Sequence, residues 1–389
     1  MSHWNEAKIK DFADVKGGKR LPKGKQLIKE HNSHPYIRIR DLGKTKYLQL
    51  TFDYEYVDDE TQKSISRYIV HKGDILISVV GTIGLIGIVG ETLDKANQTE
   101  NCDKIINIKG VLPEYLYYYL KSSFGQDEIK KGTVGAVQPK LPLKNVQDIS
   151  VLYPAMEEQE KIVAILSAID EKIETNEVVN NNLLEQVLAI YRYRFVDTTN
   201  ELRQTCRADE YFDISIGKTP PRKEPQWFST NPKDVTWVSI SDMGTCGLYI
   251  SKSSKQLTRE AVDHHNVKIV PDNTILLSFK LTVGRIAITD GEMTTNEAIA
   301  HFKTNKKEIN EYLYCYLKCF NYQTMGSTSS IATAVNSKII KGMPFVVPTN
   351  EEITEFHSLA APMFAKIKAN QAEISNLTKL RDTLLPKLI

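Results

Sequence analysis

The residues with the clearest chemical meaning are basic side chains near the amino terminus. Residues 16–46 hold ten lysines and arginines but only two acidic residues. A local excess of positive charge of this kind can neutralise nucleic-acid phosphates, although the formal net charge of the whole chain is only +2. An ordinary solvated loop can have the same composition, so charge alone leaves both interpretations open.

Motifs that would indicate an enzyme are incomplete. Residues 217–219 (GKT) resemble the end of a phosphate-binding loop, but Phe212 stands where the first glycine must be. No Glu-x-Lys follows residues 271–272 (PD), as a nuclease motif would require. Residues 231–233 (NPK) lack the second proline and the aromatic residue with which amino-methyltransferases hold a flipped base. These absences favour a binding protein over an enzyme.

The cysteine pattern argues against a metal or disulfide framework. The five cysteines show no Cys-x-x-Cys spacing, and we interpret Cys315 and Cys319, one helical turn apart, as packing residues. His264 and His265 also lack further metal ligands at helical spacing. The longest apolar runs are too short to span a bilayer, and no signal-like segment follows Met1. We therefore predict a cytoplasmic protein with no metal site and no membrane partner.

The chain repeats itself, which identifies the elements that must position these side chains. Three segments recur in the same order, at offsets of 197 to 201 residues. They are residues 114–121 (EYLYYYLK) with 311–318 (EYLYCYLK), 36–43 with 237–244, and 75–84 with 275–284. A period this long indicates a duplicated domain. The segments between the repeats diverge, as expected of one scaffold with two different reading surfaces.

Each copy is predicted to be an α/β domain. Short β-branched runs bounded by Gly, Asn and Asp predict strands. They lie at residues 36–40, 75–80 and 85–89, and again at 235–240, 274–279 and 285–289. Each copy then ends in a strand-like run closed by proline, at residues 149–154 and 344–348.

A long helix is predicted after each domain. Its seam positions recur at alternating spacings of four and three residues, which is the coiled-coil signature. They are Ile162, Leu166, Ile169, Ile173, Asn176, Asn180, Leu183, Val187, Ile190 and Arg194, and then Phe356, Ala360, Met363, Ile367, Asn370, Ile374, Leu377, Arg381, Leu384 and Leu388. Two helices of about 50 Å each would bury these seams against one another.

Asparagine interrupts both seams. Asn176 and Asn370 occupy equivalent positions, and Asn180 adds a third. If the helices lie antiparallel about their midpoints, Asn180 faces Asn370. A buried asparagine that must find a partner disfavours wrong registers, so these three residues are candidates for setting the register. Asparagines that face solvent where the helices splay would give the same pattern.

The elements together predict an α+β fold. Two similar globular α/β domains would be separated by two long helices that form an intramolecular antiparallel coiled coil. The predicted boundaries are 1–153 for the first domain, 154–197 for the first helix, 198–348 for the second domain and 349–389 for the second helix.

The ordered set of motifs resembles the specificity subunit of type I restriction-modification systems, over essentially the whole chain. Pro154 and the Glu158-Gln159 pair resemble the family's entry into its first conserved helix, and residues 380–388 resemble the end of its second. Trp4 and residues 12–18 resemble the usual domain opening, which residues 212–217 repeat.

The sequence departs from the family pattern at two places. Glu352-Ile353 replaces the Glu-Gln pair in the second copy, which predicts different capping of the second helix. The chain stops at Ile389, where family members often continue through a Ser-Gly step, which suggests a naturally short or trimmed tail.

The resemblance implies a mechanism. Each domain would be a target-recognition domain that reads one half of a split, asymmetric sequence in double-stranded DNA. The helix pair would set the unread spacer and dock two modification subunits. Those partners would use S-adenosylmethionine to methylate adenine, and restriction subunits would add cleavage driven by ATP and Mg. This chain would carry no catalytic residue and no cofactor.

Polar residues on the divergent segments are the candidate DNA contacts. The turns at 81–84 and 281–284 and the segments at 132–140 and 326–338 would let backbone approach phosphates and side chains reach base edges, although ordinary turn chemistry explains them equally well. The candidates in the first domain are Lys19, Arg20, Arg38, Arg40, Arg67, Lys131, Gln138 and Lys140. Those in the second domain are Lys218, Arg222, Lys223, Ser239, Lys280, Arg285, Asn336 and Lys338.

Two other functions stay open on the sequence alone. One is a self-contained DNA methyltransferase or endonuclease, against which the missing catalytic tetrapeptides argue. The other is a coiled-coil adaptor that binds no DNA, against which the basic stretch at residues 16–46 argues.

Overall fold

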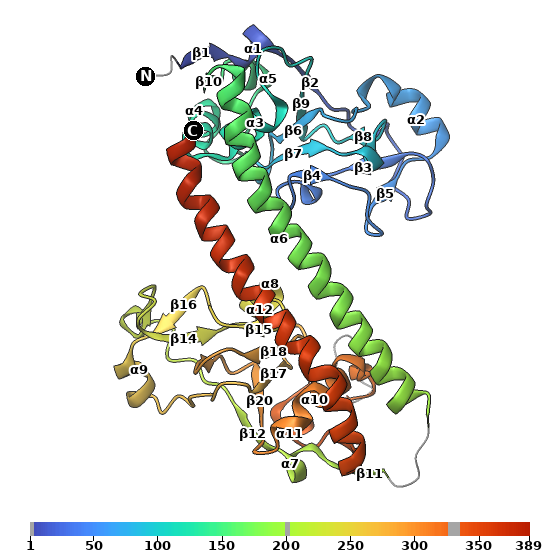
Figure 1. The fold of residues 1–389 in the computed structure, drawn as a ribbon, viewed down its shortest axis with the longest axis vertical. Helices are drawn as coiled ribbons and strands as arrows, with labels where there is room; N and C mark the ends of the chain where they lie inside the picture. The colour runs from blue at the N-terminus through green and yellow to red at the C-terminus, as the bar shows by residue number, and fades with distance from the viewer. Residues whose placement is uncertain (1–3, 199–202, 326–334) are drawn as a thin grey trace. The chain divides into compact units, whose positions relative to one another are not determined.

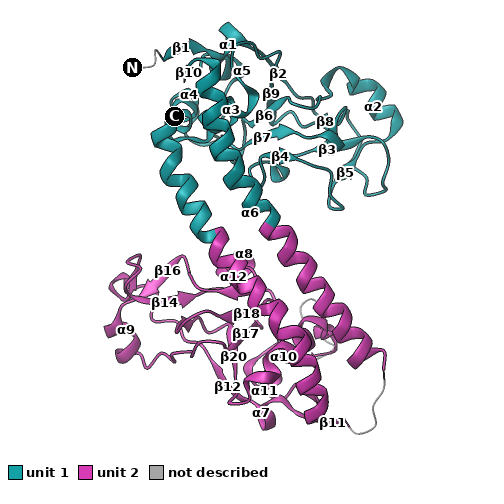
Figure 2. Cartoon of the chain, in the orientation of Figure 1, with its two compact units in different colours: residues 1–175, 375–389 teal, residues 176–374 magenta. Residues whose placement is uncertain are grey.

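The structure is a computed structural model that describes residues 4–198, 203–325 and 335–389 (Figure 1). Its contacts divide the chain into two compact units, which Figure 2 shows in separate colours. Unit 1 comprises residues 1–175 and 375–389, and unit 2 comprises residues 176–374. Each unit thus combines one repeated domain with a segment of each long helix. The four-part division by residue number stays a prediction.

Unit 1 is built on a five-stranded sheet in the order β2-β9-β6-β7-β4. These strands are β2 (Asp14–Gly17), β9 (Cys102–Ile106), β6 (Ile75–Ser78), β7 (Ile86–Val89) and β4 (Tyr47–Leu48). The smaller sheets are β5 (Glu55–Tyr56), β3 (Pro35–Ile37) and β8 (Asn97–Gln98), and the pair β1 (Asn5–Lys8) with β10 (Ser150–Tyr153). β6 and β7 are buried along their whole length, as their unbroken apolar sequences predict.

The Tyr-rich helix of unit 1 lies inside the domain. The short helices are α1 (Ile9–Phe12), α2 (Asp59–Ile65), α3 (Pro113–Lys121), α4 (Ser123–Gly132) and α5 (Leu143–Gln147). In α3 every residue from position 115 to position 120 is buried. The hydroxyl groups of Tyr115 and Tyr119 donate to the carbonyls of Leu152 and Ser150, at 2.9 and 3.1 Å. The repeated Tyr and Leu residues therefore serve packing, with each buried hydroxyl hydrogen-bonded.

Unit 2 repeats the sheet order of unit 1, as β12-β20-β17-β18-β15. These strands are β12 (Asp213–Ile216), β20 (Ile299–Lys303), β17 (Ile275–Ser278), β18 (Ile286–Thr289) and β15 (Tyr249–Ile250). The smaller sheets are β13 (Phe228–Ser229), β16 (Lys255–Leu257), β14 (Val235–Val238) and β19 (Thr294–Thr295), and the pair β11 (Gln204–Arg207) with β21 (Pro344–Val347). The short helices are α7 (Ala208–Tyr211), α8 (Ile240–Thr245), α9 (Arg259–His264), α10 (Asn310–Cys319) and α11 (Ser337–Lys341). The duplication read from the sequence is thus a duplication of topology.

Two predicted strands end earlier than their β-branched runs suggest. The run at residues 36–40 becomes β3 and a 3-10 turn at Ile39–Asp41, and the run at 235–240 becomes β14 followed by α8. In both copies an aspartate accepts the backbone N–H that would continue the strand: Asp41 binds Arg38 N at 2.7 Å, and Asp242 binds Ser239 N at 2.8 Å. At both sites the hydrogen bond to the aspartate carboxylate ends the strand, despite the β propensity of the residues that follow.

Two long helices, α6 (Met156–Tyr191) and α12 (Asn350–Leu388), contribute a segment to each unit. In unit 1, Ile162 and Leu166 of α6 belong to the core on which Leu384 and Leu388 of α12 pack. Arg381 of α12 donates to Asp170 of α6 at 3.0 Å, and the hydroxyl of Tyr118 donates to the same carboxylate at 2.8 Å. Asp170 is therefore buried with two partners, which offsets the cost of removing its charge from water.

In unit 2 the three seam asparagines have hydrogen-bond partners, and Asn176 and Asn370 are buried while Asn180 is partly buried. The Asn370 side-chain amide donates to the Asn180 side-chain oxygen at 2.8 Å, which confirms the predicted contact. Asn176 donates to Glu373 at 2.9 Å rather than to another asparagine. Asn176 and Asn370 are 3% and 1% exposed, so the solvent-facing alternative is wrong for both. That these residues set the register stays a prediction.

The buried face of α12 differs from the predicted seam at one step. Phe364 is 2% exposed, whereas Met363, the predicted seam residue, is only partly buried. The ring of Phe364 lies 5.6 Å from the ring of Tyr314 on α10, edge to face. At this position α12 therefore packs its side chain into the core of its own domain. The buried face of α12 is thus not a strict coiled-coil seam.

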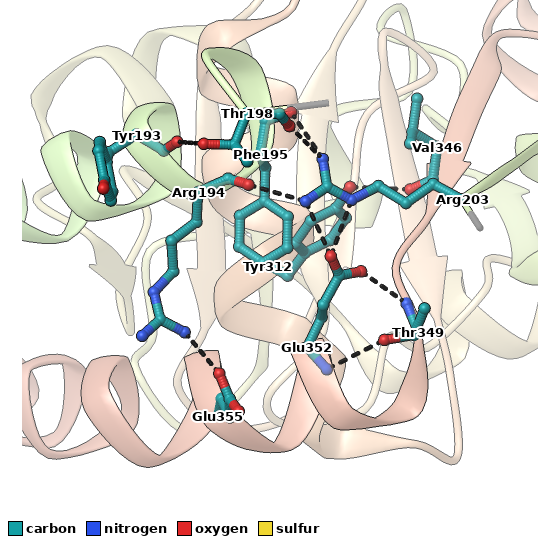
Figure 3. A network of polar contacts seen from close by, with 10 residues as sticks. All are labelled: Tyr193, Arg194, Phe195, Thr198, Arg203, Tyr312, Val346, Thr349, Glu352 and Glu355. Carbon is teal, nitrogen blue, oxygen red and sulfur yellow. Dashed lines mark hydrogen bonds and ion pairs between the residues drawn. The ribbon is translucent and has the colours of Figure 1, made fainter. Parts of the chain in front are cut away.

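The start of α12 is tied to the chain that follows α6 by one arginine (Figure 3). Arg203 donates to the carboxylate of Glu352 at 2.8 Å and to the Arg194 and Thr198 carbonyls at 2.7 and 3.0 Å. Glu352 also accepts from the backbone N–H of Thr349, while the Thr349 hydroxyl accepts from Glu352 N. This reciprocal pair is a capping box.

The first long helix begins differently. Gln159 is fully buried, and its amide group accepts from Leu112 N and donates to the Pro154 carbonyl, both at 2.9 Å. Its counterpart Ile353 is an apolar residue of the second core. The start of the first long helix is therefore held by a buried glutamine, whereas the start of the second is held by a capping box. This is the difference in capping that the Glu352-Ile353 departure predicted.

Candidate nucleic-acid interface

Three of the predicted contacts in unit 1 line one concavity. Arg20, Arg38 and Arg40 surround a volume of about 970 Å³. Tyr36 and the turn residue Gly81 also line it. The turn after β6 reaches the same concavity as the arginines, and Ile39, which stands between Arg38 and Arg40, lines it as well. The fold thus brings together candidates separated by up to 61 positions in the sequence.

Carboxylates hold these arginines in place. Glu55 accepts from both Arg38 and Arg40, the latter at 3.0 Å, and Glu100 accepts from Arg20 at 3.0 Å. The Arg40 guanidinium also donates to the Asp53 carbonyl at 3.0 Å. The three arginine side chains remain 43% to 84% exposed. The result is a set of oriented donors with acceptors between them, which suits hydrogen-bond recognition better than plain charge neutralisation.

The remaining candidates of unit 1 fall into two groups. Gln138 and Lys140 lie on an exposed loop whose Val134 and Lys140 backbones pair, and Lys140 also bridges to Val80 beside the Gly81 turn. Lys19, Arg67 and Lys131 do not line the concavity. Lys19 lies 5.7 Å from the centre of the Tyr68 ring, Arg67 is exposed on the adjoining 3-10 helix, and Lys131 pairs with Glu128 at 2.7 Å.

Unit 2 has a smaller concavity at the equivalent place in the repeat. Arg222, Trp237, Ser239 and Lys255 line a volume of about 330 Å³. Trp237 and Ser239 occupy the positions of Tyr36 and Arg38 in the duplicated segment. The indole of Trp237 thus replaces the phenol of Tyr36, and the hydroxyl of Ser239 replaces the guanidinium of Arg38. The two concavities therefore offer different hydrogen-bonding groups.

Several candidates of unit 2 already have partners within the fold. The Ser239 hydroxyl caps α8, the Asn336 side chain caps α11, and Arg285 donates to the Ile240 carbonyl at 2.6 Å. Lys218 donates to the His265 carbonyl at 2.6 Å. As DNA contacts these residues stay predictions. Lys223 and Lys338 are exposed. Residues 326–334 of the predicted segment 326–338 lie outside the described residues.

The turns that close β6–β7 and β17–β18 are held by the same pair of serine hydrogen bonds. In unit 1 the buried Ser78 hydroxyl donates to the Thr82 carbonyl at 2.6 Å and accepts from Leu85 N at 2.8 Å. In unit 2 the Ser278 hydroxyl donates to the Thr282 carbonyl at 2.6 Å and accepts from Arg285 N at 3.0 Å. Both turns are therefore rigid and present their tips in the same way.

The central residue of the tip differs between these turns. Gly81 has a φ of 75°, and Leu281 at the same position has a φ of 60°. A left-handed backbone at a leucine costs about 1–2 kcal/mol, a cost that glycine avoids. The Leu281 side chain is 100% exposed, so no packing within unit 2 offsets this strain.

Charged residues surround the Leu281 turn. Lys280 is its exposed neighbour, with the ammonium 5.7 Å from the centre of the Phe279 ring. Burial acts to raise the pKa of Glu297, but a hydrogen bond from Thr219 and the charges of Arg222 and Lys280 bring that pKa below its usual value.

Sequence reasoning missed four residues at these sites. Glu55 and Glu100 lie outside the basic stretch, and only strand pairing brings them to it. Phe52 is 95% exposed beside the Asp53 carbonyl that Arg40 binds. Leu281 stood in the aligned repeat, where the exchange of a turn glycine for leucine was a usable signal.

Unit 2 contains a buried histidine, His301. His301 is fully buried between the Ser215 hydroxyl at 3.0 Å and the Thr295 hydroxyl at 2.7 Å. Burial, aided by the charge of Lys303, lowers the pKa of His301 to about 3. Within the described part of the chain, no three metal-binding side chains gather into a cluster. None of its helices is long and apolar enough to cross a membrane.

Comparisons with known proteins agree with the resemblance. A family model for the type I restriction modification DNA specificity domain matches residues 1–186 and again residues 201–376. The type I restriction enzyme MjaIX specificity subunit of Methanocaldococcus jannaschii is 28% identical over 99% of this chain and 92% of its own length. The HindI specificity subunit of Haemophilus influenzae is 22% identical over 92% and 95%.

A solved structure shares the fold. The type I restriction-modification S subunit from M. genitalium aligns over 100% of this chain and 96% of its own, with a TM-score of 0.55 at 17% sequence identity.

Proposed function

The chain belongs to the type I restriction-modification DNA specificity family, and from that premise we propose that each of its two repeats reads one half of a two-part, asymmetric DNA sequence. The observation that carries this proposal is the pair of concavities at equivalent places in the repeat. They share a scaffold but carry different side chains, Tyr36 and Arg38 in one and Trp237 and Ser239 in the other. Two domains with the same fold but different hydrogen-bonding side chains are suited to reading two different half-sites.

The first concavity supplies both kinds of DNA contact. An arginine held by a carboxylate presents its remaining N–H groups in a fixed direction, which suits the O6 and N7 atoms of guanine. Glu55 is an acceptor at the same place and suits the amino group of cytosine. The exposed lysines outside the concavity supply phosphate contacts, which position the domain and make binding sensitive to salt.

We assign the paired helices to assembly. In this proposal they set the unread spacer between the half-sites and dock two modification subunits, which bind S-adenosylmethionine and methylate adenine. Restriction subunits supply cleavage driven by ATP and Mg. The chain itself contributes recognition and no catalytic group, and it acts in the cytoplasm, where its DNA target lies.

The test is to co-express the chain with a modification subunit and to map methylated adenines across the host genome. The proposal expects a motif of two specific halves separated by a gap of constant length. A single uninterrupted motif would contradict two separate readers. Methylation by the purified chain alone would instead indicate a self-contained methyltransferase, and failure of the assembled complex to shift any DNA would indicate an adaptor.

A further inference from the structure

We propose that Leu281 is a specificity-determining residue of the second repeat, whose side chain packs against the 5-methyl group of a thymine in the major groove. This inference rests on the proposed function and deepens it, because it names one contact and its chemistry. It starts from a comparison within the chain: the two repeats build the same turn and differ at its tip.

Side-chain hydrogen bonds fix the position of the tip of this turn. A buried serine fixes both of its sides in each repeat, through the Ser278 hydroxyl in unit 2 and the Ser78 hydroxyl in unit 1. In unit 2 the Thr282 N–H also donates to the Lys280 carbonyl at 2.6 Å, which makes Leu281 the central residue of a three-residue turn. Such a turn with a positive central φ is rare and strained for a residue with a side chain.

Folding does not explain the leucine. Its side chain is 100% exposed, and the other repeat forms the same turn with Gly81. A backbone that glycine satisfies better carries a large apolar group that touches nothing in its own unit. Strain of this kind persists where a function needs the side chain in that position.

The surroundings of Leu281 select DNA as the partner. Lys280 is adjacent to Leu281 and exposed, and Arg222 lines the second concavity. In unit 1 the corresponding Gly81 and Thr82 line the concavity with Arg38 and Arg40. By its equivalence to Gly81, we place the Leu281 tip on the reading surface of unit 2, with Lys280 beside it as a group suited to a phosphate contact.

An apolar tip has one specific target in the major groove. Among the four bases only thymine presents a methyl group there, whereas cytosine carries a hydrogen at the same ring position. A single leucine on a rigid turn can discriminate thymine from the other bases by van der Waals contact and exclusion of water. Gly81 cannot do this, so the first repeat reads its half-site without such a contact.

The experiment uses the complex with modification subunits and a duplex that carries the mapped target. Each thymine of the half-site read by residues 198–348 is replaced in turn by deoxyuridine, which removes only the methyl group. We expect one replacement to weaken binding by the wild type about three- to tenfold, as expected for one lost methyl contact. Leu281→Gly should bind the unmodified duplex that much more weakly and lose its sensitivity to the replacement.

Two further variants separate the contact from the backbone. Leu281→Asn keeps a residue that tolerates the left-handed backbone and should behave like Leu281→Gly. Leu281→Met keeps an apolar side chain and should retain part of the sensitivity. If no replacement affects the wild type, or if Leu281→Gly stays equally sensitive, the thymine contact is wrong. Increased fluorescence of 2-aminopurine beside the half-site would also overturn it, because it would indicate insertion between bases.

The controls keep this inference apart from the proposed function. A wild-type complex that does not prefer its mapped duplex over a scrambled one would contradict the proposed function itself. A wild type that discriminates well, with Leu281→Gly discriminating equally at every position, would contradict only the leucine contact.

Discussion

At the scale of single residues, acidic partners decide what the basic side chains can do. Glu55 accepts hydrogen bonds from Arg38 and Arg40 and is itself 19% exposed. Without it, this patch of the surface would carry more net positive charge, and the two guanidinium groups would be oriented less uniformly. Glu55 therefore lowers the affinity that comes from positive charge and raises the specificity that comes from oriented arginines.

Glu55→Gln should raise the affinity for DNA of random sequence severalfold and lower the preference for the mapped target about tenfold, because it adds net positive charge and releases the arginines. Competition binding at two salt concentrations measures both. Glu91→Gln is the matched control, since Glu91 pairs with Lys72 away from the concavity and makes the same change in charge. Equal losses of preference in the two variants would count against an orienting role for Glu55.

His301 gives the fold a dependence on pH. Its pKa of about 3 in the folded state lies below the ordinary value of about 6.5, so the unfolded chain takes up the proton first as the pH falls. The stability contributed by the neutral imidazole is present above pH 6.5 and is lost progressively between about pH 6.5 and pH 3.

We therefore expect the wild type to lose about 2 kcal/mol more unfolding free energy than His301→Gln between pH 7 and pH 5. Urea denaturation of the two proteins at both pH values measures the difference. The same pH dependence in both proteins would show that His301 is not the group responsible.

At the scale of elements, the long helices combine two kinds of interface. In unit 2, α12 buries Asn370 against α6 and Phe364 against α10. The heptad pattern predicted the first contact because both helices carry it in their own sequences. It could not predict the second, because the domain face of α12 depends on where α10 lies.

The Asn180–Asn370 pair should cost stability and favour one register. Replacing both residues with leucine should raise the melting temperature by a few degrees, because two apolar groups then replace a buried amide pair. Asn180→Leu alone should lower it, because the Asn370 amide, 1% exposed, would lose its partner. Thermal unfolding of the three proteins tests this, and a large loss in the double variant would contradict a role limited to register.

At the scale of the whole molecule, the chain is one fold used twice. The five-stranded sheets of the two units correspond strand by strand, and each unit has its own core. Separate cores allow the reading surface of one unit to change while the other keeps its structure.

Exchange of residues 1–150 for the corresponding domain of another family member should therefore change one half of the methylated motif and leave the other half and the gap length as they were. Genome-wide mapping of methylated adenines gives the readout, and the unexchanged chain in the same host is the control. A change in both halves would show that the two readers are not independent.

The sequence by itself determined the duplication, the strand cores and the long helices, because each depends on periodicity or repetition along the chain. It offered the Asn180–Asn370 contact as one of two alternatives, between which the structure decided. It also placed Arg20, Arg38 and Arg40 among the candidates. Only the tertiary structure decided what surrounds them: β3 pairs with β5 so that Tyr36 lies opposite Glu55, and this register delivers the carboxylate that holds Arg38 and Arg40. Strand register and backbone dihedral angles are properties of the folded chain, which is why the role of Glu55 and the strain at Leu281 had to be seen in three dimensions.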